Sequence, residues 1–312
     1  MANAPLPATL AKPNGDNPTR RELLSQIFAV LGLSIVFGAT LVLLALVGQL
    51  LLTGLPRLDA SFFVSYPSSD PAIAGILSAW VGSLLVISTT MVFAIPLGIA
   101  AGIYLEEYAP ANWVSALIEI NVNNLAGVPS IVYGLLALGL FKQTLNLGAS
   151  VLTAGATLAL LILPIVIVTT REALRAVPNE LREAAYALGA TQWQMIWDHV
   201  LPCAGGSILT GIIMGLSRAI GETAPLVTVG ALTFIAFLPP APLQAEFPFI
   251  SFAWLRAPFT VMPIQVFNWV SRPEAAFQVN AAAGGVVLLG MTITLNGLAI
   301  YLRYRFRRGM RW

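Results

Sequence analysis

Long apolar runs separated by short polar segments dominate the chain. Six of them are long enough to cross a membrane as helices, since a hydrocarbon layer of about 30 Å needs about 20 mostly apolar residues. They cover residues 27–53, 76–105, 120–141, 152–170, 206–234 and 279–302. Four contain a proline, which removes a backbone donor and predicts a helix kink: Pro96, Pro129, Pro164 and Pro225. The pattern predicts an all-α membrane protein with six transmembrane helices.

The region before the first apolar run is polar and rich in proline. Residues 1–26 are therefore expected to form a disordered tail. The run that follows, residues 27–53, is too long for the apolar region of a cleaved signal peptide. We expect it to remain as a signal anchor and first transmembrane helix.

The placement of Lys and Arg predicts the orientation. With six spans, eleven basic residues fall on one side and four on the other, with Arg218 inside a span. Basic loops face the cytoplasm, so both termini are predicted to be cytoplasmic, including the basic tail 303–312. If one helix were miscounted, this Arg-rich tail would lie on the opposite side.

Composition excludes several other classes of protein. Only 10% of the residues are charged, against about 25% in a soluble domain; 57% are apolar and the mean hydropathy is +0.83. A net charge of +2 gives no indication of a nucleic-acid partner, and the single cysteine, Cys203, excludes an internal disulfide. His199 is the only histidine, and no second His or Cys close to it in the sequence suggests a metal site.

The chain contains no nucleotide-binding phosphate loop. Its only lysines, Lys12 and Lys142, lie outside the required Gly-rich pattern. If transport is driven by ATP, the nucleotide must bind to another polypeptide.

The segment 171–203 predicts two short helices joined by a tight turn. Pro178 suits the first position of a helix, and Gly189 suits its left-handed end. Thr191 and Gln194 then form a capping box, so a second helix should begin at once and run to Pro202. The alternative is an ordinary amphipathic loop lying on the membrane.

The fifth apolar segment carries an unusual group of polar residues. Arg218 and Glu222 are four residues apart, so they share a helix face and can pair. Ser217 and Thr223 lie beside them, and Pro225 should break the helix there. Charges inside a membrane helix indicate a functional site. We interpret the group as a path for an anion; the alternative is a structural ion pair.

Two further segments have simpler interpretations. Residues 238–277, on the predicted outer side, are rich in proline and aromatic residues. They either anchor at the membrane interface or contact an external protein, and the outer loop 55–71 has the same two interpretations. Gly211 and Gly215 form a small-residue pattern that indicates close packing of helices within the chain.

Two sequence motifs resemble those of a known family. The pattern Glu183-Ala-Ala185, Gly189 and Leu201-Pro202 resembles the EAA loop of ABC-importer permeases, although His199 stands where that family usually has isoleucine. Residues 217–226, Ser-Arg-Ala-Ile-Gly-Glu-Thr-Ala-Pro-Leu, are similar to the signature of phosphate ABC-transporter permeases of the PstA type, as are residues 123–134 and 259–269. The similarity covers about residues 73–305.

This resemblance implies a type I ABC-importer permease fold with a core at 73–305. It implies that Glu183, Ala184, Ala185 and Gly189 contact an ATPase subunit. It also places Arg218 and Glu222 on a phosphate path, with Ser217 and Thr223 beside them.

The resemblance also implies partners and a location. The expected partners are a second permease of the PstC type, two PstB-type ATPase subunits that bind ATP and Mg, and an external phosphate-binding protein. The chain would lie in the bacterial inner membrane and would itself hold no cofactor and catalyse no reaction. Two alternatives stay open: a permease for sulfate, molybdate or another oxyanion, and a secondary transporter or channel. The latter usually has internal repeats, and the sequence reveals no clear one.

Overall fold

The computed structural model describes residues 18–242, 249 and 251–309, and all regular structure within these ranges is helical. The first 17 residues of the predicted tail, the end of the basic tail and part of the outer segment lie outside the described residues. By its internal contacts the chain divides into two units, residues 1–50 and 51–312.

Most helices are joined by short connections, and the longer ones are residues 65–76 and 230–252. In chain order they are α1 (Pro18–Gly54), η1 (Leu55–Arg57), α2 (Ala60–Val64), α3 (Leu77–Ile103), η2 (Tyr104–Tyr108), α4 (Trp113–Ala126), α5 (Ser130–Ala137), η3 (Leu138–Thr144), α6 (Val151–Arg175), α7 (Asn179–Ala187), α8 (Gln192–Gln194), η4 (Met195–Val200), α9 (Leu201–Gly221), α10 (Ala224–Val229), η5 (Ala253–Arg256), α11 (Met262–Val270) and α12 (Ala275–Gly309).

The predicted membrane spans are largely confirmed. Five described helices are long and apolar enough to cross a membrane, and the bent pair α4–α5 makes a sixth if it is counted as one span. The ends of several helices differ, and α12 runs over Ala275–Gly309 where 279–302 was predicted. Residues 18–26, predicted as disordered, form the first turns of α1, and α6 continues to Arg175.

Two of the predicted spans are broken. The third, expected as one helix over 120–141, turns by 106° between α4 and α5, because Gly127 ends α4 and Pro129 cannot continue it. The fifth, expected over 206–234, ends at Gly221, before Pro225. By contrast, α3 and α6 continue without interruption through Pro96 and Pro164.

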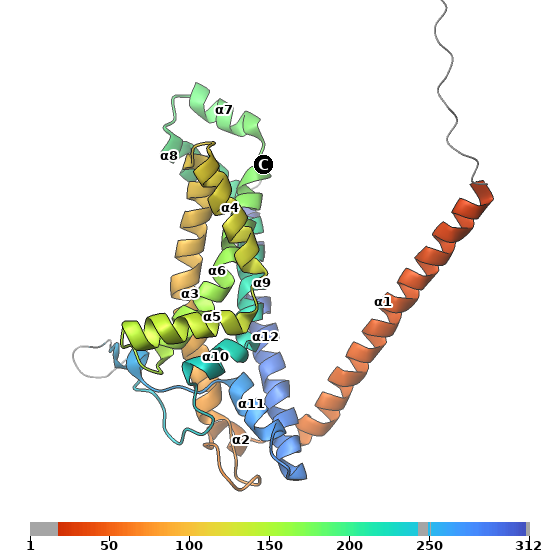
Figure 1. Cartoon of the computed structure of the whole chain (residues 1–312), viewed down its shortest axis with the longest axis vertical. Helices are drawn as coiled ribbons and strands as arrows, with labels where there is room; N and C mark the ends of the chain where they lie inside the picture. Colours follow the sequence, from red (N-terminus) through yellow and green to blue (C-terminus); the bar gives the residue numbers. More distant parts are fainter. Residues whose placement is uncertain (1–17, 243–248, 250, 310–312) are drawn as a thin grey trace, which may run out of the picture. The chain divides into compact units, whose positions relative to one another are not determined.

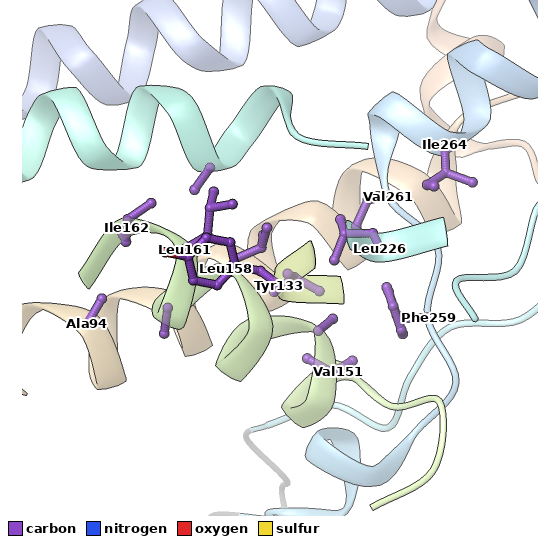
Figure 2. Packing of buried hydrophobic residues seen from close by; sticks show 14 residues of the cluster. Ala94, Tyr133, Val151, Leu158, Leu161, Ile162, Leu226, Phe259, Val261 and Ile264 are labelled. Atoms are coloured by element: carbon purple, nitrogen blue, oxygen red, sulfur yellow. The ribbon is translucent and has the colours of Figure 1, made fainter. Parts of the chain in front are cut away.

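The main core of residues 51–312 lies where α6 packs against α3 and α9. Figure 2 shows its side chains, with Leu158, Leu161 and Ile162 of α6 packed near Tyr133 and Leu226. Small and hydroxyl-bearing residues lie in the contact between α3 and α6, where buried Thr90 donates to the Gly155 carbonyl at 3.2 Å. A second core joins the C-terminal ends of α3 and α6 and the N-terminal end of α9 to α7 and η4.

The segment 238–277, expected either to anchor at the membrane interface or to contact an external protein, contains a helix. Met262–Val270 form α11, with a proline in its first turn where a missing N–H is harmless. Trp269 is fully buried and packs near Phe62. Part of this aromatic segment therefore builds a third core, with α2 and α12, instead of facing lipid.

Gly82 on α3 provides a test of how this outer segment packs. A Cβ at Gly82 would overlap the carbonyl oxygen of Thr260, and the neighbouring Ser83 hydroxyl accepts a hydrogen bond from the Met262 N–H at 2.8 Å. Gly82→Ala should therefore lower the free energy of unfolding by about 1–3 kcal/mol, the usual cost of overpacking. Thermal unfolding in detergent measures this. Gly290→Ala is the control, because a Cβ there meets nothing within 4 Å; equal melting temperatures for both variants would contradict the packing.

Candidate translocation site and docking loop

The break after α9 exposes a charged pair. Arg218 Nε donates to Glu222 Oε1 at 3.2 Å, as the spacing predicted. Arg218 lies on the last turn of α9, while Glu222 follows it in extended backbone with ψ at 126°. Arg218 lies inside a candidate membrane span, as predicted; its side chain is 37% exposed on this chain and that of Glu222 is 18% exposed.

The arginine in this pair retains donors for another group. Its bond to Glu222 uses Nε, and within the described part of the chain neither terminal nitrogen of Arg218 has a hydrogen-bond partner. A guanidinium binds oxyanions through such a planar pair of donors. The pair can therefore hold an anion without giving up its own contact.

The other two residues predicted for this site have different positions. Ser217 faces α12, where its hydroxyl donates to Asn296 Oδ1 at 2.7 Å and thereby ties α9 to α12. Thr223 lies in the break, where its carbonyl accepts from the N–H groups of Leu226 and Val227. The structure therefore pairs Arg218 with Glu222, places Thr223 in the break as a backbone acceptor, and directs the Ser217 hydroxyl to α12.

The short helix α5 supports the break from its other side. A Cβ at Gly134 would lie 2.7 Å from Pro225 Cα and would overlap the Thr228 hydroxyl, so α5 and α10 touch through their backbones. Tyr133 donates at 2.7 Å to the carbonyl of Leu125, near the end of α4. Both helix breaks, at Pro129 and at Pro225, are therefore packed against each other and fixed by neighbouring side chains, as broken helices in a membrane require.

The predicted helical hairpin is present and lies at one end of the bundle, away from α11 (Figure 1). Gly189 ends α7 with φ at +87°, and the Ala190 N–H bonds the Ala185 carbonyl at 3.1 Å, which completes a Schellman motif. The capping box of Thr191 and Gln194 has both of its hydrogen bonds. Pro178 is the N-cap, one position earlier than expected.

The second helix of the hairpin does not stop at Pro202. It continues through the π-helical segment η4 and α9 to Gly221. Pro202 has no N–H to donate to the preceding turn. The wider π-helical turn of η4 accommodates this missing backbone hydrogen bond. The second helix of the hairpin and Arg218 therefore lie on one continuous helix, Gln192–Gly221.

One of the four residues predicted to contact an ATPase subunit does not lie on the surface of the hairpin. Glu183, Ala184 and Gly189 are exposed, but Ala185 is 4% exposed and packs into the core below α7. Large apolar side chains extend the exposed surface, with Trp193 stacked on Trp197 at 5.4 Å between ring centroids. Exposed residues of the hairpin include Glu183, Ala184, Tyr186, Leu188, Gly189, Trp193 and Trp197.

Ion pairs that were not predicted from the sequence hold the hairpin to η2, which continues α3 at its C-terminal end. Arg182 Nη2 donates to Glu107 Oε1 at 2.8 Å and to the Leu174 carbonyl at 2.9 Å, while Gln192 Nε2 donates to the Glu107 carbonyl. Nearby, Arg175 pairs with Glu106 through two bonds of 2.9 Å. We call Arg182, Glu107 and Gln192 the clamp. The sequence did contain a signal for these ion pairs, because Glu106 and Glu107 are predicted to lie on the same side of the membrane as Arg175 and Arg182.

Comparison with known proteins agrees with this geometry. Residues 94–312 match the model of the binding-protein-dependent transport system inner membrane components. The PstA phosphate transport system permease proteins are similar along most of their length. That of Yersinia pestis is 32% identical over 296 residues, with 92% of each chain covered. That of Xylella fastidiosa strain Temecula1 is 32% identical over 255 residues, 80% of this chain and 83% of the relative.

Solved structures support the fold. A bacterial alginate ABC transporter in complex with its periplasmic protein contains a chain that matches with a TM-score of 0.63 at 14% identity, covering 92% of this chain and 96% of that one. The MetNI methionine ABC transporter matches with a TM-score of 0.54 at 18% identity, covering 74% and 95%.

The bundle, its broken helix and its protruding hairpin thus have the type I ABC-importer permease fold, in a multi-pass membrane protein. The chain belongs to the family of binding-protein-dependent transport system inner membrane components.

Proposed function

We propose that the chain is the transmembrane permease subunit of an ATP-driven phosphate importer in the bacterial inner membrane. It forms half of the pathway for inorganic phosphate, together with a second permease of the PstC type. The names of its PstA relatives support this cargo. In this proposal 27–53 is the first transmembrane helix, 73–305 is the permease core, and both termini, with the tail 303–312, are cytoplasmic.

The observation that carries the proposal is the pair at the break of α9. Fixed Arg218 offsets the cost of dehydrating an anion, and its terminal nitrogens remain available to it. Glu222 positions Arg218 when the path is empty. It can also accept a hydrogen bond from hydrogen phosphate, which sulfate at neutral pH cannot donate.

The exposed surface of the hairpin supports an ATPase contact. Two PstB-type subunits would bind ATP and Mg and dock against Glu183, Ala184 and Gly189. The helices α8, η4 and α9 are continuous. Closure of the two ATPase subunits would therefore tilt α9 and switch access to Arg218 from one side of the membrane to the other. An external phosphate-binding protein would deliver the substrate on the opposite face.

Selective uptake tests the cargo. Proteoliposomes are prepared with the whole complex and the external binding protein, and ATP is supplied on the side of the membrane that carries the ATPase subunits. These proteoliposomes should accumulate labelled phosphate. A tenfold excess of sulfate or molybdate should leave the rate unchanged. Uptake of sulfate in place of phosphate would contradict phosphate as the cargo but would still agree with a permease function. Phosphate uptake by this chain without ATPase subunits would instead indicate a secondary transporter.

A further inference from the structure

Helix α4 contacts its own chain along one side only. That side packs on α6, where Glu119 pairs with Arg171 at 3.1 Å between Oε1 and Nη1. The half-buried residues of α4 are spaced by four, three and four residues and so form one row along the helix: Ser115, Glu119, Val122 and Ala126. Every other residue of α4 is exposed on this chain, and none is buried.

The opposite side of α4 is exposed along its whole length. A second row with the same spacing is displaced by two residues, which is about 200° around the helix. Its first three members, Trp113, Leu117 and Ile120, are 76%, 50% and 56% exposed, and Asn124 follows them. Asn121, also exposed, adjoins this row. We call these five residues the α4 outer face.

The two asparagines place amide groups deep in the membrane. Helices α4 and α5 together form a candidate span, and it begins at Trp113, a residue typical of the membrane interface. Asn124 is 11 residues further along, about 16 Å at 1.5 Å per residue. This distance is about half of a hydrocarbon layer of about 30 Å.

These amides lack partners beyond their own helix within the described residues. Asn121 Nδ2 donates to the Leu117 carbonyl at 2.7 Å, and the Asn124 side chain makes no hydrogen bond. Exposed hydroxyls elsewhere in the spans behave differently, because Thr40 and Thr294 each donate to the carbonyl four residues earlier. An amide has two donors and an acceptor, and lipid can satisfy none of them.

The composition of the face indicates a protein surface. A water-filled path would leave exposed Leu117 and Ile120 in contact with water, whereas another membrane helix covers apolar and amide groups together. Helix α1 of the same chain offers few partners near its middle, because the hydroxyls of Ser34 and Thr40 already donate to their own helix. The face therefore requires a helix from another subunit that carries hydrogen-bonding side chains.

We infer that the second permease packs a membrane helix against the α4 outer face and forms hydrogen bonds with Asn121 and Asn124. This inference rests on the proposed function, which requires a second permease but leaves its contact surface unassigned. A helix on this face would end beside the break between α4 and α5. Because that break packs against the break after Arg218 through Gly134 and Pro225, the partner would help to enclose the path.

Photocrosslinking in the intact complex tests the identity of the partner. Benzoylphenylalanine in place of Ile120 should form an adduct with the second permease, identified by its mass. Ile293 of α12 is the control, since it lies within a candidate span and is 63% exposed; the same probe there should give no such adduct. Equal adducts from both positions would overturn the inference. So would an Ile120 adduct only with lipid, with α1 or with a second copy of this chain.

Side-chain variants test the hydrogen bonds. Asn124→Leu should lower the fraction of second permease retained after dilution in detergent by about threefold, the loss expected for one hydrogen bond between membrane helices. Thr294→Val should change nothing, because that hydroxyl bonds its own helix. The chain alone should melt at the wild-type temperature in both variants. Wild-type retention by Asn124→Leu, or a lower melting temperature of that chain alone, would contradict the inference.

The two proposals fail in different ways. If the wild-type complex gives the Ile120 adduct with the second permease but moves no phosphate, the proposed function is wrong and the contact surface stands. If the complex moves phosphate and the Ile120 probe reaches only lipid, the contact surface is wrong and the proposed function stands.

Discussion

Replacing Arg218 with glutamine is expected to abolish phosphate uptake while the complex still assembles and hydrolyses ATP. Glutamine removes the charge that offsets dehydration of the anion and leaves Glu222 without its partner. A hydrogen bond between the anion and a charged donor contributes about 1.5–3 kcal/mol. Since both terminal nitrogens of Arg218 would be lost to the anion, uptake should fall by about 100-fold or more.

Radiolabelled phosphate uptake and ATPase activity, followed in parallel in proteoliposomes, measure this effect. Arg218→Lys keeps the charge but loses the planar pair of donors, so an intermediate rate is expected. Glu222→Gln keeps Arg218 and should reduce uptake less than Arg218→Gln does. Wild-type uptake by Arg218→Gln would show that the pair is structural and that the substrate path lies elsewhere.

Breaking the clamp is expected to separate ATP hydrolysis from transport. The Glu107 side chain is 8% exposed and its partner Arg182 is 16% exposed, so Arg182→Gln leaves a buried carboxylate unpaired at a cost of about 3–5 kcal/mol. The hairpin would keep its own caps and still dock, but it would no longer be held to the end of α3. ATPase activity should therefore continue, with phosphate uptake reduced about tenfold and a lower melting temperature.

Two variants test the reason for this loss. Arg175→Gln removes a neighbouring arginine whose side chain is 60% exposed, and surface pairs contribute about 0–1 kcal/mol, so little change is expected. The double variant Glu107→Gln with Arg182→Gln leaves no unpaired buried charge. Its melting temperature should return towards the wild-type value, while the ratio of phosphate uptake to ATP hydrolysis stays low. If ATP hydrolysis and phosphate uptake remain fully coupled in Arg182→Gln, the clamp has no part in transmitting movement from the hairpin to the bundle.

The sequence predicts the spans and the hairpin well because their causes are local. Apolar length determines a membrane helix, and the cap residues Gly189 and Thr191 determine where α7 ends and α8 begins. The Arg218–Glu222 pair follows from a spacing of four residues, although Glu222 lies just past the end of α9. In each case the interacting groups are close in the chain.

The remaining features depend on packing between distant segments. Proline alone does not indicate which helix breaks: Pro129 and Pro225 lie at breaks that pack against each other through Gly134, whereas Pro96 and Pro164 lie within continuous α3 and α6. The clamp joins residues 75 apart in the chain. The inward position of Ala185 depends on side chains of η4.

The continuity of α8, η4 and α9 has a mechanical consequence. The described helix runs for 30 residues, from Gln192 to Gly221, a rod of about 45 Å at 1.5 Å per residue. If it pivots about its docking end, a tilt of about 5° displaces the other end by about 4 Å, more than the length of a hydrogen bond. A lever of this length would let a small rotation at the ATPase surface make or break the contacts of Arg218.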